Sequence, residues 1–121
     1  MPKKIIVIED EKTIRNLYRR ILSETDYLVT MVENIVEAEV EIKKNKYDLF
    51  ITDLLLPDGI GTDLISLIRG KDVGAIILLI TGSLTHEERL AHVEKFRLNG
   101  CLDKPFNVQE FMTIIERSLG A

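Results

Sequence analysis

The sequence lacks the features that mark secreted, membrane-spanning or nucleic-acid-binding chains. It has a single cysteine, Cys101, in 121 residues. One cysteine cannot form an internal disulfide, so a reducing, cytoplasmic compartment is expected. No apolar run is long enough to cross a membrane, and the first four residues contain no apolar signal segment. The net charge is -4 with both signs mixed along the chain, and no basic stripe predicts direct contact with nucleic acid.

The chain also shows no internal repeat, no low-complexity segment and no linker. Its hydrophobic share of 45% and charged share of 30% are ordinary for a globular protein. A length of 121 residues suits one hydrophobic core. We therefore expect residues 1–121 to form a single domain.

Apolar runs of strand length alternate with segments that have helical spacing. The strand candidates are residues 5–8, 28–32, 47–53, 75–80 and 101–102. The first helix is marked by apolar residues from Ile14 to Leu22 and the third by those that follow Gly61. The other three are marked by an N-cap residue and its partner three positions on: Asn34 and Glu37, Thr85 and Glu88, Asn107 and Glu110.

Five strands alternating with five helices predict a doubly wound α/β fold, because parallel strands need right-handed crossovers. The flavodoxin-like strand order 2-1-3-4-5 is the expected topology. The fourth helix has the weakest apolar stripe, since Leu90, Val93 and Phe96 share it with many charged residues.

Polar side chains follow four of these strands. Glu9 and Asp10 come after the first, Asp53 ends the third, Thr81 follows the fourth and Lys104 follows the fifth. In a parallel sheet these strand ends share one edge, where ligands bind in open α/β folds. The expected strand order places Glu9 and Asp10 beside Asp53.

Three carboxylates in one pocket repel one another, and a hard divalent cation would relieve that repulsion. Mg²⁺ prefers oxygen ligands and could neutralise an incoming phosphoryl group. Asp53 could then attack phosphorus as a carboxylate nucleophile. Lys104 would hold one phosphoryl oxygen by its charge, and the Thr81 hydroxyl would donate a hydrogen bond to another.

Four motifs in order carry a resemblance to a known family. They are Glu9-Asp10, the run from Asp53 through Pro57 to Gly61, Thr81-Gly82, and Lys104-Pro105-Phe106. With these motifs the sequence resembles the receiver domain of bacterial two-component response regulators over essentially its whole length. Such domains are not enzymes on other substrates and catalyse only their own phosphorylation and dephosphorylation.

The resemblance implies that a sensor histidine kinase or a phosphotransfer protein donates a phosphoryl group to Asp53. It implies Mg²⁺ held by Asp10, Asp53 and the backbone carbonyl of Leu55, with Glu9 reaching the ion through water. A cis peptide bond between Lys104 and Pro105 is also implied. The fourth helix, fifth strand and fifth helix would form the surface that changes, controls an output domain or partner, and serves as a dimer interface.

Two positions depart from the family pattern. The milder departure is Glu9, since the acidic pair is Glu-Asp rather than Asp-Asp and keeps both charges. The other departure bears on the switch. The residue three before the lysine is usually Tyr or Phe, and that ring turns inward on phosphorylation; here it is Cys101. The coupling between threonine and aromatic ring is therefore not expected in its usual form. We expect signalling through the loop after Thr81 and the fourth helix, with little movement at position 101.

Simpler interpretations remain for single residues. Asp10 could cap the first helix, Thr81 could bond its own backbone, and Lys104 could lie in solvent. Cys101 is best interpreted as a small buried apolar residue.

Three other functions remain as alternatives. A phosphatase or phosphotransferase would usually need an aspartate where Leu55 stands. A flavin carrier would need a Ser/Thr/Gly-rich loop in place of Glu9-Asp10-Glu11. A receiver that binds proteins without being phosphorylated is the third.

Overall fold

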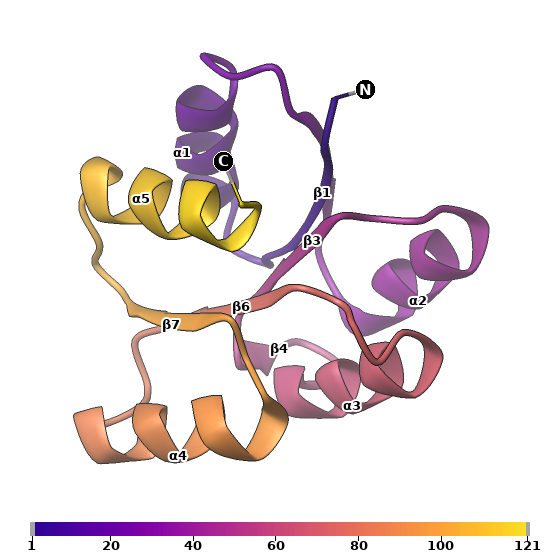
Figure 1. Ribbon diagram of the computed structural model, residues 1–121, viewed down its shortest axis with the longest axis vertical. Coiled ribbons are helices and arrows are strands. Elements are labelled where there is room, and N and C mark those ends of the chain that lie inside the picture. Colours follow the sequence, from indigo (N-terminus) through magenta and orange to yellow (C-terminus); the bar gives the residue numbers. More distant parts are fainter. Residues whose placement is uncertain (1, 121) are drawn as a thin grey trace.

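The computed structural model describes residues 2–120, and its elements alternate between strands and helices as predicted (Figure 1). The strands are β1 (Lys4–Ile8), β2 (Leu28–Val32), β3 (Leu49–Thr52), β4 (Leu55–Leu56), β5 (Gly59–Ile60), β6 (Ile77–Thr81) and β7 (Gly100–Asp103). The helices are α1 (Lys12–Leu22), α2 (Ile35–Lys44), α3 (Gly61–Lys71), α4 (His86–Phe96) and α5 (Val108–Ser118).

The main sheet has five parallel strands in the order β2-β1-β3-β6-β7. With the two-residue strands β4 and β5 set aside, this is the predicted flavodoxin-like order 2-1-3-4-5. Strands β1 and β3 are neighbours, and Ile8 pairs with Thr52 at their carboxyl ends. The residues that follow, Glu9 and Asp53, therefore leave the sheet side by side.

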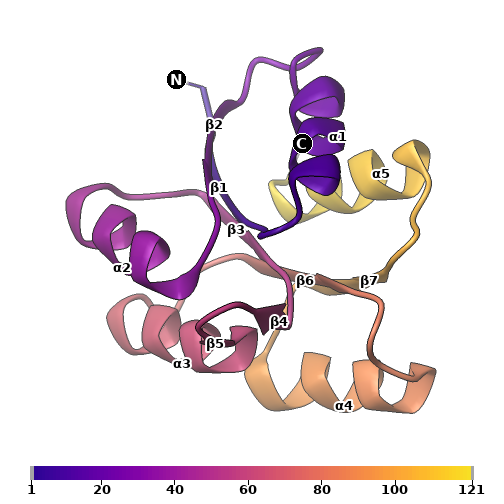
Figure 2. The same ribbon diagram turned by 180° about the vertical axis from the view of Figure 1, so that it is seen from behind.

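Helices cover both faces of this sheet. Helices α1 and α5 lie on one face and α2, α3 and α4 on the other (Figures 1 and 2). Along β1, Ile5 and Val7 pack with the first group, whereas Ile6 and Ile8 pack with the second. Burial on both faces explains why the strand sequence is apolar throughout rather than alternating.

The predicted caps start three of the helices. In each, the side-chain oxygen of the N-cap residue accepts a hydrogen bond from a backbone N–H three residues on, which would otherwise lack a helical partner. The pairs are Asn34 and Glu37 at 2.8 Å, Thr85 and Glu88 at 3.1 Å, and Asn107 and Glu110 at 2.7 Å. These local bonds set where α2, α4 and α5 begin.

Two features differ from the sequence-based expectation. The segment after Asp53 forms a small antiparallel hairpin, β4 with β5, instead of a plain turn. The fourth long strand begins two residues later and ends one residue later than predicted, so Thr81 is its last residue. Helix α4 has no fully buried residue, which agrees with its weak apolar stripe.

Candidate functional site

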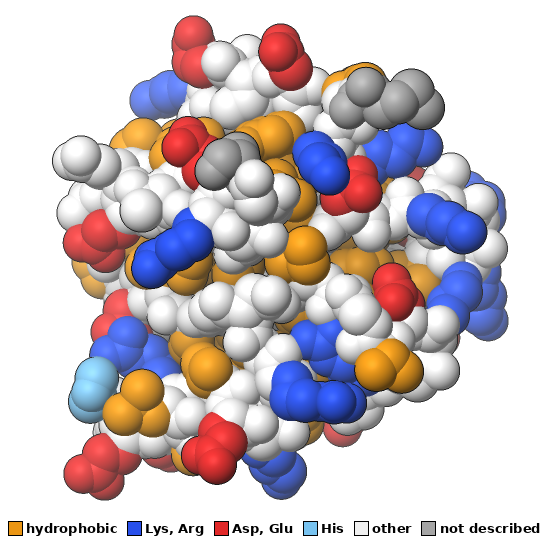
Figure 3. All heavy atoms as spheres, in the orientation of Figure 1, with side chains coloured by type: hydrophobic (Ala, Val, Ile, Leu, Met, Phe, Trp, Pro, Cys, Tyr) orange, Lys and Arg blue, Asp and Glu red, His pale blue; other side chains and the backbone are white. Residues whose placement is uncertain are grey.

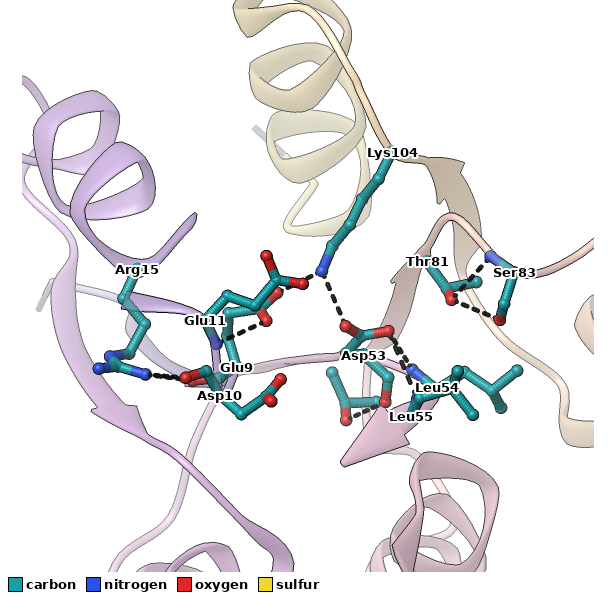
Figure 4. Close-up of polar contacts among 11 residues, drawn as sticks. Glu9, Asp10, Glu11, Arg15, Asp53, Leu54, Leu55, Thr81, Ser83 and Lys104 are labelled. Carbon is teal, nitrogen blue, oxygen red and sulfur yellow. Dashed lines mark hydrogen bonds and ion pairs between the residues drawn. The ribbon is translucent and has the colours of Figure 1, made fainter. Parts of the chain in front are cut away.

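The carboxyl-terminal edge of the sheet brings together most of the predicted site residues. Glu9 and Asp10 follow β1, Asp53 follows β3, and Lys104 follows β7. Figure 4 shows these side chains converging from three separate strands. Their convergence depends on the strand order, because β1 and β3 must be neighbours for the acidic residues to meet.

Lys104 is the cation that joins the buried acidic residues. Its Nζ lies 2.6 Å from Oε1 of Glu9 and 2.8 Å from Oδ2 of Asp53 (Figure 4). The Glu9 side chain is only 2% exposed and that of Asp53 10%. Carboxylates with so little access to water are tolerated because a charged partner is hydrogen-bonded to them. The interpretation of Lys104 as a solvated surface residue is therefore wrong.

Asp53 is held by both of its carboxylate oxygens. Oδ2 accepts from Lys104, while Oδ1 accepts from the backbone N–H of Leu54 at 2.6 Å. Glu9, on the other side of Lys104, is held in a similar way, since its Oε2 accepts from the backbone N–H of Glu11 at 3.2 Å. The Asp53 carboxylate thus has one orientation, set by a backbone donor and an ammonium group.

Asp10 is the exposed member of the acidic group. One of its carboxylate oxygens lies within 4.8 Å of carboxylate oxygens of Glu9 and Asp53. Helix α1 begins after Glu11, which makes no side-chain cap bond, so Asp10 does not serve as its cap. Arg15 instead orders this loop by donating to the backbone carbonyls of Glu9 and Asp10 at 3.0 and 2.7 Å.

The buried charges change the pKa values of the groups around them. Burial raises the pKa of Glu9, and the hydrogen bond from Lys104 only partly offsets this. For Lys104, burial would lower the pKa, but the hydrogen bonds to Asp53 and Glu9 outweigh it and the pKa rises. The pKa of Tyr18 is raised by its burial and by the charges of Glu9 and Asp53. Lys104 therefore stays protonated throughout the physiological range.

Thr81 lies at the correct edge but is not bonded to the acidic group. Its side chain is buried, and its hydroxyl lies 3.0 Å from Oγ of Ser83 (Figure 4). Within residues 2–120, no hydrogen bond joins the Thr81 side chain to Asp53 or to the Lys104 ammonium. The only bond between Thr81 and Lys104 in that range joins their backbones, since the Lys104 N–H donates to the Thr81 carbonyl oxygen at 3.2 Å. The threonine is close to the site and engaged with its own loop.

The segment after Asp53 is fixed from two sides. A Cβ atom at Gly61 would overlap the backbone carbonyl oxygen of Asp53, so only glycine allows α3 to begin this close to the site. The carboxylate of Asp58 accepts from the backbone N–H groups of Ile35 and Val36 at 2.9 and 3.1 Å. Asp58 thereby ties the β4–β5 hairpin to the start of α2.

Sequence reasoning missed this role of Asp58. An Asp-Gly pair is a common turn signal, and here it also supplies a cap for a helix that begins 23 residues earlier. The only sequence signal is a carboxylate next to a turn, which does not indicate which helix it reaches.

Position 101 behaves as a small apolar residue. Cys101 is partly buried and packs against the core on the α2–α3–α4 side of the sheet. Burial raises the pKa of its thiol to about 11, so little thiolate forms near neutral pH. The Lys104–Pro105 peptide bond, implied to be cis, is cis.

The donor set suits a hard divalent cation. Glu9, Asp10 and Asp53 offer carboxylate oxygens that lie within 4.8 Å of one another, close enough to share an ion. Oxygen-only ligands of this kind favour Mg²⁺ over softer metals. The residues present therefore fit the implied ion.

The fold and this edge define a class of protein: a flavodoxin-like α/β domain with an acidic cluster and a bridging lysine at the carboxyl ends of its strands. A family model described as the response regulator receiver domain matches residues 5–116. The chain belongs to this family, the receiver domains of two-component response regulators.

Individual relatives agree with the family match. The chemotaxis protein CheY of Halobacterium salinarum is 33% identical over 121 residues, which are 100% of both chains. The transcriptional regulatory protein KdpE of Staphylococcus aureus is 33% identical over 120 residues, but these cover 97% of this chain and 51% of that protein. The chain thus spans about half the length of some curated relatives.

A solved structure shows the same fold. The non-phosphorylated HemR receiver domain from Leptospira biflexa superposes with a TM-score of 0.90 at 31% identity, covering 100% of this chain and 96% of the other.

Among residues 2–120, no helix has the length and apolar character needed to cross a membrane.

Proposed function

We propose that Asp53 accepts a phosphoryl group. The observation that carries this proposal is the placement of its carboxylate. Asp53 lies at a strand end, Oδ2 is 2.8 Å from the Lys104 ammonium, and the carboxylates of Glu9 and Asp10 lie alongside. A carboxylate oxygen of Asp53 would attack phosphorus as the bond from phosphorus to the donor breaks, giving an aspartyl phosphate. A sensor histidine kinase or a phosphotransfer protein is the proposed donor.

The other residues of the edge have roles that follow from their charges. Asp10, Asp53 and the backbone carbonyl of Leu55 would hold Mg²⁺, with Glu9 reaching it through water. The ion would neutralise charge on the phosphoryl oxygens. The Lys104 ammonium already contacts Oδ2 of Asp53. It would therefore need to move only a short way to meet an oxygen of a phosphoryl group attached to that carboxylate. Thr81 would exchange its bond to Ser83 for another phosphoryl oxygen.

Intact mass after treatment with acetyl phosphate tests this proposal. With Mg²⁺ the wild-type chain should gain the mass of one phosphoryl group, and Asp53→Asn should gain none. Asp26→Asn, an exposed aspartate on the loop before β2, is the matched control and should gain it. Labelling of Asp53→Asn, or equal labelling in excess chelator, would contradict the proposal. No labelling of the wild type would favour a receiver that acts without phosphorylation.

We further propose that the phosphorylated domain signals through the Thr81 loop and α4. Helix α4 has no fully buried residue, so moving it costs less packing energy than moving any helix with buried residues. Cys101 is too small to replace a ring that turns inward. Amide chemical shifts with and without beryllofluoride should change around α4 in both wild type and Cys101→Ala. Loss of these changes in Cys101→Ala, with beryllofluoride still bound, would show that position 101 is required.

The wider setting is part of the same proposal. Residues 1–121 would act as one receiver domain in the cytoplasm. The surface of α4, β7 and α5 would control an output domain or partner and could be shared between two copies in a dimer. The domain itself would make no contact with nucleic acid or membrane, and its only catalysis would be its own phosphorylation and dephosphorylation.

A further inference from the structure

The amino-terminal edge of the sheet, opposite the site described above, contains a hollow of about 830 Å³. It lies where β1 and β3 begin and where α2 and α3 end, so residues far apart in sequence line it. Its size falls within the range of small-molecule sites in proteins. We call it the lysine hollow, after the residues described next.

Lysines surround the lysine hollow. Five of its lining residues are Lys4, Lys43, Lys44, Lys46 and Lys71, against two aspartates. Both carboxylates are already engaged with backbone N–H groups: Asp48 accepts from Lys4 at 2.8 Å and Asp72 from Gly74 at 3.0 Å. Figure 3 shows lysine and arginine side chains gathered on the side of the molecule where α2 lies. In a chain of net charge -4, this end is locally positive.

Most of these ammonium groups lack a carboxylate partner. Among residues 2–120, Lys4, Lys43 and Lys46 form no ion pair, and Lys44 has only a 3.8 Å contact with Glu41. Lys71 is different, because its Nζ donates to the backbone carbonyl of Ile42 at 2.6 Å. That bond covers part of the negative end of α2, which would otherwise repel an anion.

Helix ends explain only some of this charge. Lysines in the last turn favour the negative end of a helix dipole, which accounts for Lys43, Lys44 and Lys71 without any ligand. Lys4 is on a strand and Lys46 on a loop, so that effect does not account for them. Nor does it account for a hollow between them.

The floor of the lysine hollow is apolar. Ile42, Phe50 and Ile68 line it and are at most 5% exposed. The ring of Tyr47 meets that of Phe50 edge to face, with centroids 6.1 Å apart. An apolar base below unpaired cations suits a ligand that has both an apolar body and a negative group.

We propose that the lysine hollow binds a small organic anion. Its flat or apolar body would lie against Tyr47 and Phe50, and its phosphate, carboxylate or sulfonate would meet Lys4, Lys43 and Lys46. The proposal does not depend on phosphorylation of Asp53, because the two sites lie at opposite edges of the sheet.

Anilinonaphthalene sulfonate is the probe, and phenylnaphthylamine is its neutral counterpart without the sulfonate. The charged dye should bind the wild-type chain more tightly than the neutral dye does. Its binding should shift the amide resonances of residues 43–48 and 71–72. The double variant Lys43→Gln/Lys46→Gln should weaken its binding about fivefold, since each exposed charge contributes modestly. The double variant Lys12→Gln/Lys95→Gln removes the same charge from exposed positions elsewhere and should bind like wild type.

Several results would overturn the proposal. One is equal affinity for the charged and neutral dyes, which would indicate an apolar surface without charge recognition. Another is an equal loss of affinity in the two double variants, which would indicate only the effect of net charge. Amide shifts outside the lysine hollow would place the dye elsewhere. Binding of a hexaglutamate peptide there without binding of the sulfonate would assign the surface to an acidic polypeptide instead.

Discussion

At the carboxyl-terminal edge of the sheet, Lys104 is bonded to two carboxylates that are almost fully buried. At the amino-terminal edge, Lys43 and Lys46 are exposed and form no ion pair within residues 2–120. At the first edge a lysine is therefore paired with buried carboxylates, and the acidic groups outnumber it. At the second edge, surplus positive charge faces water. Their ligands are expected to differ in the same way, a cation at the first edge and an anion at the second.

The polarity of the helices explains why the two signs separate. Every long strand of this parallel sheet ends where a helix is about to begin, so helix N-termini gather at the carboxyl edge. Those ends are partly positive and favour acidic groups, whereas the helix C-termini at the other edge favour lysine and arginine. Helices α2 and α3 follow this rule with basic residues in their last turns. The fold itself thus sorts charge between its two edges.

The largest expected effect comes from removing Lys104, the cation that is paired with the buried carboxylates. Lys104→Met leaves Glu9 and Asp53 buried without their partner, and should lower the free energy of unfolding by about 3 kcal/mol. Because burial raises the pKa of Glu9, protonation relieves this cost, and the loss should be larger at pH 8 than at pH 5. Urea unfolding at both pH values measures it.

Lys71→Met is the control from the opposite edge. It removes one hydrogen bond, to Ile42, and should cost about 1 kcal/mol at either pH. If Lys104→Met and Lys71→Met lose the same free energy of unfolding, the burial of the carboxylates around Lys104 does not make that lysine more important for stability than the exposed Lys71.

The second effect is stabilisation by Mg²⁺. If the ion binds the acidic edge, saturation at a hundred times its dissociation constant should add about 2.7 kcal/mol to the free energy of unfolding. Asp10→Asn removes a proposed ligand that is not buried, and should abolish most of the gain. Asp72→Asn, at the lysine edge, should keep it. A gain that is the same in all three proteins would indicate a general salt effect.

The smallest effect concerns the link between the β4–β5 hairpin and α2. Two backbone hydrogen bonds, to Ile35 and Val36, lower the pKa of Asp58. Because the pKa of Asp58 is lower in the folded protein than its ordinary value of 3.8, the ionised carboxylate stabilises the fold at pH values above 3.8. This stabilisation is lost as the pH falls through the lowered pKa. Asp58→Asn should therefore reduce the melting temperature slightly at pH 6 and have less effect as the solution becomes acidic.

Thermal melts of wild type and Asp58→Asn across this pH range test the link. Asp63→Asn, another exposed aspartate in the first turn of α3, is the comparison for loss of a carboxylate near a helix start. The difference in melting temperature between wild type and Asp58→Asn should shrink toward low pH. If it grows instead, the ionised Asp58 carboxylate is not the source of the stabilisation.

Several features of this protein were determined by the sequence alone, because they depend on neighbouring residues. Apolar runs bounded by turns located the five long strands, and Asn34, Thr85 and Asn107 located the starts of three helices. Strand-to-helix alternation then required a parallel sheet, which was enough to place Glu9, Asp10, Asp53 and Lys104 at one edge. The weak packing of α4 was also visible in its mixture of apolar and charged residues.

The pairing of these groups was decided only by the tertiary structure. Lys104 meets Glu9 across 95 residues and Asp53 across 51, and Asp58 reaches α2 across 23. The lysine hollow likewise joins the start of β1 to the ends of α2 and α3. No local periodicity encodes such contacts, because they depend on how strands order and helices pack. The sequence therefore specified which charges the protein has and on which edge the acidic group lies, while packing decided which charges are paired and buried and which remain exposed.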